Sequence, residues 1–212
     1  MSLSTTPAPA RTDRADRGRS APGGGSLRSV RTAGIAVATG SAAWAVCMLV
    51  YGLGAEPGIA ATVYNSSTLL FQIGLVALVA VQLRTGAVGT GRLARVLLHV
   101  EHVLLGLAMV STVQTILVPT WDDVPAWIAL DAFWPISMLG MFAIGIRIAI
   151  AGRWRGVARF WPLGAESWAP VCVPAAALLP ALAPAIAAGH LLLGYAVLGL
   201  ILARRPELTG AR

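Results

Sequence analysis

The chain has 212 residues, of which 57% are hydrophobic and only 12% are charged. A soluble domain of this length carries about twice that charged fraction, and here the apolar residues gather in long uncharged runs, so a soluble fold is excluded. The net charge is +7 and every basic residue is an arginine. Because the arginines flank the apolar runs, membrane topology and anionic lipid headgroups explain them better than nucleic acid does.

The first part of the chain is rich in Ser, Thr, Pro, Gly and Arg. Such a composition cannot bury an apolar face, so we expect a disordered, arginine-rich cytoplasmic tail over residues 1–31. The apolar run behind it is too long for the core of a signal peptide and is read as an uncleaved first span. A transmembrane helical domain over residues 32–205 and a short cytoplasmic tail over residues 206–212 complete the predicted organisation.

Five apolar runs follow the tail. About 20 residues cross the hydrocarbon core as a helix, so the first four runs each predict one span. The fifth run is too long for one helix, and prolines at 180 and 184 lie in its middle, where proline ends or kinks a helix. We divide it so that Pro184 begins a sixth helix; a single span plus a re-entrant segment is the alternative. The predicted spans are Ala33–Leu53, Ile59–Leu83, Leu93–Val118, Trp127–Ala151, Trp168–Leu182 and Ala185–Ala203.

The connections alternate between arginine-rich and arginine-free segments. The positive-inside rule therefore places both termini in the cytoplasm, which requires an even number of spans. The sequence thus predicts an all-α, polytopic transmembrane bundle of about six spans in the plasma membrane. The basic connections contain Arg84, Arg92 and Arg95, then Arg153, Arg155 and Arg159, and finally Arg204 and Arg205.

The segment Arg153–Trp168 predicts a cytoplasmic amphipathic helix between spans four and five. Trp154, Val157, Ala158 and Trp161 share one face at helical spacing, and the arginines lie away from it. Such a helix lies in the headgroup layer; an irregular loop with interfacial tryptophans is the alternative. The predicted lipid-interface residues are Arg153, Trp154, Arg155, Arg159 and Trp161.

Two pairs of stretches resemble each other in the same order along the chain. Trp44-Ala-Val-Cys-Met-Leu matches Trp134-Pro-Ile-Ser-Met-Leu, and His102-Val-Leu-Leu-Gly-Leu-Ala matches His190-Leu-Leu-Leu-Gly-Tyr-Ala. This pattern fits two inverted three-helix halves, as in many transporters. The alternative is that the similarity arose by chance, because short matches are common in a sequence dominated by Leu, Ala and Gly.

Three polar residues are predicted near the outer face. Counted from the outer helix ends, Asp131 lies about 6 Å deep, His190 about 7.5 Å and Asn65 about 9 Å. Pro135 cannot donate to the carbonyl of Asp131, which predicts a kink beside the acid. The three side chains could form one pocket in which an Asp–His pair binds a proton, or the pair could simply hold two helices together.

A second polar group is predicted deeper in the membrane. Glu101 and His102 lie about 12 to 14 Å from the cytoplasmic end of their helix. Arg147 could pair with Glu101 or could extend to the headgroups. Ionisable groups inside a span are expensive to insert and are therefore functional candidates by default.

No cofactor or metal is predicted. His102 and His190 differ in depth by about 8 Å, which does not suit the two axial ligands of one haem. Cys47 and Cys172 lie in apolar runs with no zinc-type spacing. No motif for hydrolysis is present.

Three stretches of the second half form a distinctive pattern: Leu130-Asp-Ala-Phe-Trp-Pro-Ile-Ser-Met-Leu-Gly-Met-Phe, Gly152-Arg-Trp-Arg-Gly-Val-Ala-Arg-Phe-Trp-Pro-Leu and Ala165-Glu-Ser-Trp. This pattern resembles a family of small multi-pass membrane proteins from high-GC bacteria. The resemblance implies a bacterial membrane location and carries over no activity or functional residue.

These observations predict a non-enzymatic membrane protein, such as a scaffold, an accessory subunit or a sensor. The alternative is a proton-linked carrier or sensor for a small solute, using Asp131, His190 and Glu101. A haem protein or intramembrane enzyme is the third possibility. The expected partners of the protein are anionic lipid headgroups, and a second copy of the chain or another membrane protein is a further possible partner.

Overall fold

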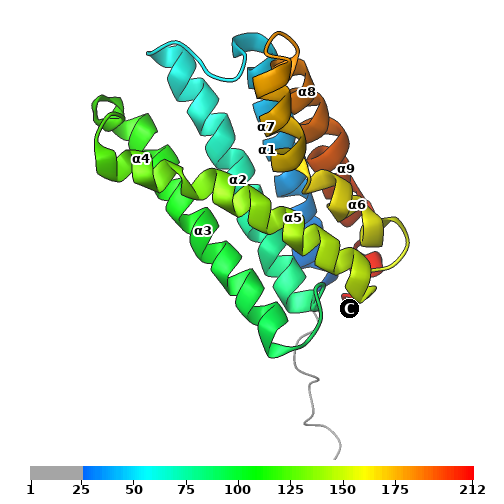
Figure 1. Ribbon diagram of the computed structural model, residues 1–212. Coiled ribbons are helices and arrows are strands. Elements are labelled where there is room, and N and C mark those ends of the chain that lie inside the picture. Colours follow the sequence, from blue (N-terminus) through cyan, green and yellow to red (C-terminus); the bar gives the residue numbers. More distant parts are fainter. Residues whose placement is uncertain (1–25) are drawn as a thin grey trace, which may run out of the picture.

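The computed structural model describes residues 26–212, so the predicted tail lies almost entirely outside the described residues. The described part is helical, and its long helices lie side by side in one bundle (Figure 1). The α-helices are α1 (Leu27–Tyr51), α2 (Ile59–Thr85), α3 (Arg92–Leu117), α4 (Pro125–Asp131), α5 (Phe133–Ala151), α6 (Val157–Ala165), α7 (Trp168–Leu178), α8 (Ala183–His190) and α9 (Val197–Arg204). The 3₁₀-helices η1 (Pro119–Trp121) and η3 (Pro206–Thr209) and the π-helix η2 (Leu191–Ala196) complete the order.

Five helical stretches are long and apolar enough to cross a membrane: α1, α2, α3, the pair α4–α5 and the run from α8 through η2 to α9. This confirms the predicted all-α membrane bundle. Pro184 lies in the first turn of α8, as the sequence predicts. The fourth stretch is interrupted at Ala132, between α4 and α5, where Pro135 leaves the carbonyl of Asp131 without its helical donor.

The remaining crossing consists of two short helices, α6 and α7, which follow one another along the bundle (Figure 1). Together they extend over residues 157–178, about 33 Å for a continuous helix, which is enough to cross the hydrocarbon core. The predicted amphipathic helix is present as α6, between α5 and α7. It packs along α5 and against η2 and α9, so it also forms the first half of the fifth crossing.

The core of the bundle is built around α1, which packs against α2 on one side and against α8, η2 and α9 on another. Glycines allow these close approaches. A Cβ atom on Gly34 would lie 2.5 Å from the carbonyl oxygen of Gly199, and a Cβ on Gly199 would lie 2.5 Å from the carbonyl oxygen of Gly34. On the other side, a Cβ on Gly40 would lie 2.7 Å from the Cα of Phe71. Small residues at such crossings are typical of membrane helices.

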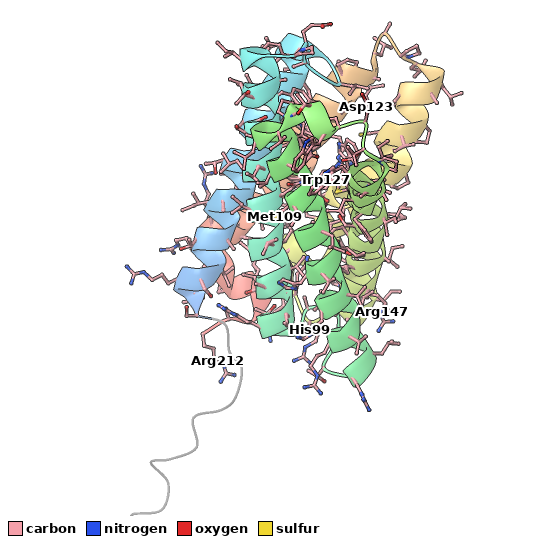
Figure 2. The ribbon with its side chains drawn as sticks, turned by 90° about the vertical axis from the view of Figure 1, so that its left-hand side faces the viewer. His99, Met109, Asp123, Trp127, Arg147 and Arg212 are labelled. Carbon is pink, nitrogen blue, oxygen red and sulfur yellow. The ribbon has the colours of Figure 1, made fainter. Side chains whose placement is uncertain are left out.

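The two ends of the bundle differ in charge. Figure 2 shows His99, Arg147 and Arg212 toward one end and Asp123 and Trp127 toward the other. The described turns at the second end contain acids and no arginine, whereas the described arginines lie in the connections and helix ends at the first end. We call them the acidic end and the arginine end. The last residues belong to the bundle: Thr209 is buried, and the amide of Arg155 donates to the carbonyl of Leu208 at 2.8 Å.

Candidate functional site in the bundle interior

The interior site begins where α6 stops and α7 starts. Glu166 and Ser167 lie between these helices. Pro170 has no N–H, so it cannot donate to the carbonyl of Glu166 four residues earlier. The Ser167 hydroxyl donates instead to the carbonyl of Gly164 at 2.7 Å and closes the end of α6. The chain is therefore non-helical halfway along a crossing, an arrangement that transporters use at binding sites.

Glu166 turns from this break into the bundle and is completely buried. Its Oε1 accepts a hydrogen bond from Nε2 of Gln82 on α2 at 2.8 Å. Its Oε2 has no hydrogen-bond partner among the described residues. The carboxyl group fits because residue 145 on α5 is a glycine, where a Cβ atom would lie 2.8 Å from Oε2. Half of this carboxyl group is thus free to bind a proton or a ligand.

Glu101 on α3 is the second buried carboxyl group, with 1% of its surface exposed. Its side chain packs against Gly140 on α5, and its Oε1 has no hydrogen-bond partner among the described residues. Arg147, which could pair with Glu101 or extend to the headgroups, is exposed and lies two turns farther along α5, about 10 Å from the level of Gly140. Of these two alternatives, the pair with Glu101 is not formed among the described residues.

Tyr195 completes this interior cluster from the last crossing. It is fully buried, and its hydroxyl group has no hydrogen-bond partner in the described part of the chain. It belongs to the π-helix η2, which packs against α6, the helix that ends just before Glu166. Single π-helical turns inside α-helices occur frequently at functional sites. We define Glu166, Gln82, Glu101 and Tyr195 as the interior cluster.

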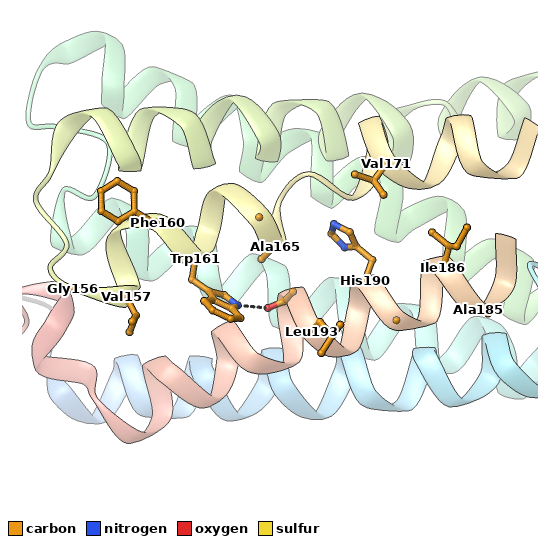
Figure 3. A pocket seen from close by; sticks show the side chains of 13 residues that line it. Gly156, Val157, Phe160, Trp161, Ala165, Val171, Ala185, Ile186, His190 and Leu193 are labelled. Carbon is orange, nitrogen blue, oxygen red and sulfur yellow. Dashed lines mark hydrogen bonds between the residues drawn. The ribbon is translucent and has the colours of Figure 1, made fainter. Parts of the chain in front are cut away.

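His190 lies on the other side of the break, in a groove of about 970 Å³ between α6–α7 and the last crossing (Figure 3). Its Nε2 lies 3.2 Å from the Ser167 hydroxyl oxygen. That hydroxyl has already used its one proton on the carbonyl of Gly164, so the neutral imidazole carries its proton on Nε2 and donates to Ser167. Trp161 also lines the groove, and its indole donates to the carbonyl of Gly194 at 3.1 Å (Figure 3).

A separate cavity of about 320 Å³ opens toward the acidic end. Aromatic rings form much of its wall, and Asp131, which is exposed, contributes a carboxylate. Trp44 stacks on Trp168 with ring centroids 5.9 Å apart, and Trp134 meets Trp44 edge-on at 5.8 Å. We call this space the outer cavity. Its lining is Trp44, Met48, Leu53, Tyr64, Asn65, Thr68, Gln72, Thr112, Thr115, Asp131, Trp134 and Trp168.

The outer cavity contains polar atoms with unused bonding capacity. The indole nitrogens of Trp44 and Trp168 and Oε1 of Gln72 have no hydrogen-bond partner among residues 26–212. Nε2 of Gln72 donates to the Thr112 hydroxyl at 3.0 Å. The cavity therefore offers an aromatic surface and a carboxylate, which together suit a small cationic molecule.

The structure unites two of the three residues predicted at the outer face. Asp131 and Asn65 line the same cavity. His190 lines the groove instead and bonds to Ser167, so the predicted Asp131–His190 pair is not formed. His102 is also apart from the interior cluster's hydrogen bonds, because its Nδ1 is occupied by the carbonyl of Leu98 at 2.8 Å.

The residues predicted to face the lipid interface have structural contacts. Trp154 is completely buried and donates from Nε1 to the Thr85 hydroxyl at 2.9 Å. Arg159 donates from Nε to the carbonyl of Ala149 at 2.9 Å. Arg153 and Arg155 are exposed, and Trp161 is 38% exposed. Some of the residues predicted at the lipid interface therefore face the interior of the bundle, and others are exposed on its surface.

Glu166, the most buried acid, was not predicted as a site residue. The sequence places it in a segment with arginines and tryptophans, which indicates an interface and not the membrane centre. Pro162 and Pro170, spaced evenly on either side of it, are the signal that could have identified a helix break there.

Metal binding by clustered side chains has no support in the described part of the chain, where no three His, Cys, Asp or Glu side chains lie together. Comparisons with protein-family models, with curated proteins and with solved structures find no match to this chain.

Proposed function

We propose that this protein is a non-enzymatic carrier or sensor of the bacterial plasma membrane that binds a small organic cation in the outer cavity. Aromatic faces attract cations, and a site that combines several aromatic rings with a carboxylate recognises ammonium groups. The observation that carries the proposal is the meeting of Trp44, Trp134, Trp168 and Tyr64 with Asp131 around one cavity. No arginine lines it.

The charge at the acidic end supports this choice of ligand. Asp122 accepts from Gln114 at 3.0 Å and from the Thr115 hydroxyl at 3.2 Å, and Thr115 also lines the outer cavity. Asp122 is thus bonded to a residue that lines the cavity, Asp131 lines it directly, and Asp123 follows Asp122 in the chain. The turns at this end contain no arginine. A mouth with charges of one sign raises the local concentration of ligands of the opposite sign.

We further propose that the arginine end faces the cytoplasm, with both termini inside, and that anionic headgroups surround it. The positive-inside rule supports this orientation. The outer cavity would then open to the outside, and the interior cluster would lie between it and the cytoplasm.

The interior cluster favours a proton-linked role over a purely structural one. Polar groups that only hold membrane helices together are expected to bond to one another. Here Glu101, Glu166 and Tyr195 each have an atom without a partner among the described residues. A carboxyl group in such a place can take up and release a proton as the bundle changes shape.

Choline binding to the purified full-length protein tests the cation site. We expect choline to quench tryptophan fluorescence, and Asp131→Asn to weaken its binding roughly 5- to 30-fold, because a charge partly exposed to water contributes about 1–2 kcal/mol. Asp123→Asn is the matched control, since Asp123 is an acid at the same end that does not line the cavity.

The neutral isostere 3,3-dimethylbutan-1-ol separates recognition of charge from recognition of shape. We expect it to bind much more weakly than choline, since it has the same branched group without the positive charge. Equal binding of both compounds, or equal weakening by Asp131→Asn and Asp123→Asn, would overturn the proposal.

A further inference from the structure

A polar cavity of about 400 Å³ lies at the arginine end, between the α2–α3 connection and the start of the segment after α5. Three arginines from three different segments line it: Arg84 at the end of α2, Arg95 in the first turn of α3, and Arg153 after α5. Gly86, Gly89 and Thr90 form the connecting wall. No acidic side chain lines this cavity.

The three guanidinium groups are available to a ligand. Arg31 and Arg159, by contrast, donate to backbone carbonyls of the bundle. Within residues 26–212 no hydrogen bond or ion pair occupies the side chain of Arg84, Arg95 or Arg153. The cavity also adjoins the first turn of α3, where Gly91 provides no side-chain cap. The unpaired amides of a helix N-terminus favour an anion.

An apolar groove of about 600 Å³ continues from this cavity along the outside of α3. Arg95 lines both spaces, and Arg92 lies beside it at the same end. The groove then follows the valines at 96, 100 and 103, which are 48%, 49% and 61% exposed. A charged cavity joined to an apolar groove on a membrane-facing helix has the shape of a phospholipid, with its phosphate at one end and an acyl chain at the other.

We propose that this site, the arginine cavity with the α3 groove, binds one anionic phospholipid. Arg84, Arg95 and Arg153 hold the phosphate, and an acyl chain lies along Val96, Val100 and Val103. Arginine suits this role because its planar, always charged group donates two hydrogen bonds to a phosphate. The groove is the reason for assigning a lipid and not a free phosphate ion.

Native mass spectrometry of the full-length protein, released from micelles that contain phosphatidylglycerol and phosphatidylcholine, tests the proposal. We expect one phosphatidylglycerol molecule to remain bound. The triple variant Arg84→Gln, Arg95→Gln and Arg153→Gln should bind it roughly 100-fold more weakly, since each arginine near a lipid surface contributes about fivefold.

The matched control is Arg155→Gln, Arg204→Gln and Arg205→Gln, which removes the same charge from the same end without touching the cavity. Equal loss in both triple variants would show general attraction to charge and overturn the site. Val100→Trp tests the groove without changing charge: it should also weaken phosphatidylglycerol binding and leave the helical circular dichroism spectrum unchanged.

Competition with inorganic phosphate tests whether the site binds a lipid or a free phosphate ion. Displacement of the lipid by phosphate at a similar concentration, together with unchanged binding to the Val100→Trp variant, would overturn the lipid assignment. Retention of phosphatidylglycerol against excess phosphate would support it.

Discussion

Replacing Gly199 by valine is expected to prevent the last crossing from packing against α1. A Cβ atom at residue 199 would lie 2.5 Å from the carbonyl oxygen of Gly34 and 2.6 Å from the amide nitrogen of Ala38. Both atoms belong to the backbone of α1, so no side-chain rotation relieves the clash. Valine adds two further carbon atoms at the same place. Only separation of the two helices can accommodate them.

The expected loss of stability is on the order of 3 kcal/mol or more, the upper part of the range for overpacked cores. Because a folded domain is stable by only about 5–15 kcal/mol, we expect a several-fold lower yield of folded protein, with the remainder aggregated or degraded. The measurement is the monodisperse fraction in size-exclusion chromatography after extraction, together with the midpoint of thermal unfolding.

Gly106→Val is the matched control for this prediction. It makes the same substitution in a membrane-spanning helix, but a Cβ atom on Gly106 would meet no neighbour within 4 Å. Its unfolding midpoint should stay near that of the unaltered protein. A Gly199→Val protein as stable as the Gly106→Val protein would contradict the close packing of α1 against α9.

The sequence predicts those features that depend on composition along one helix. The membrane-spanning stretches follow from apolar length, and the start of α8 follows from Pro184. The interruption at Ala132 follows from the missing N–H of Pro135. Each of these effects acts within a few residues of its cause, so one sequence is sufficient.

The sequence does not predict the direction in which a side chain points around its helix axis. Asp131, Asn65 and His190 were placed at similar depths, but only the first two line one cavity. Which neighbour a side chain meets depends on the rotation of each helix, which is fixed by contacts such as those of Gly34 and Gly199. The sequence of one chain does not show which residues of different helices come into contact.

The sequence predicts a short fifth span at Trp168–Leu182, which α7 matches, but it does not predict that α6 continues this crossing toward the arginine end. α6 begins after arginines and tryptophans that indicate an interface, and it has only nine residues, too few for a span by itself. Trp154 was expected to face headgroups, but its indole donates to Thr85 of another helix. Glu166, at the junction of two half-crossings, was consequently left out of the predicted site.

Replacing Glu166 by glutamine is expected to abolish proton-linked transport and to preserve the fold. Glutamine has nearly the same shape, and its carbonyl oxygen can still accept the hydrogen bond that Gln82 donates at 2.8 Å. A carboxyl group can bind and release a proton, whereas a carboxamide cannot. In proteoliposomes we expect a pH gradient to accelerate choline uptake by the unaltered protein and to have no effect on the variant, a difference of at least about tenfold.

Choline binding should remain unchanged in the Glu166→Gln variant, because Glu166 does not line the outer cavity. Glu207→Gln, an exposed acid near the C-terminus, controls for the loss of one negative charge. If the Glu166→Gln variant only unfolds at a lower temperature and keeps its response to the pH gradient, Glu166 is a packing residue. An unaltered response in the Glu166→Gln variant with loss of response in Glu101→Gln would instead assign the proton to the second carboxyl group. The helix break and the buried acid would then have separate roles, with the break shaping the bundle and Glu101 linking it to protons.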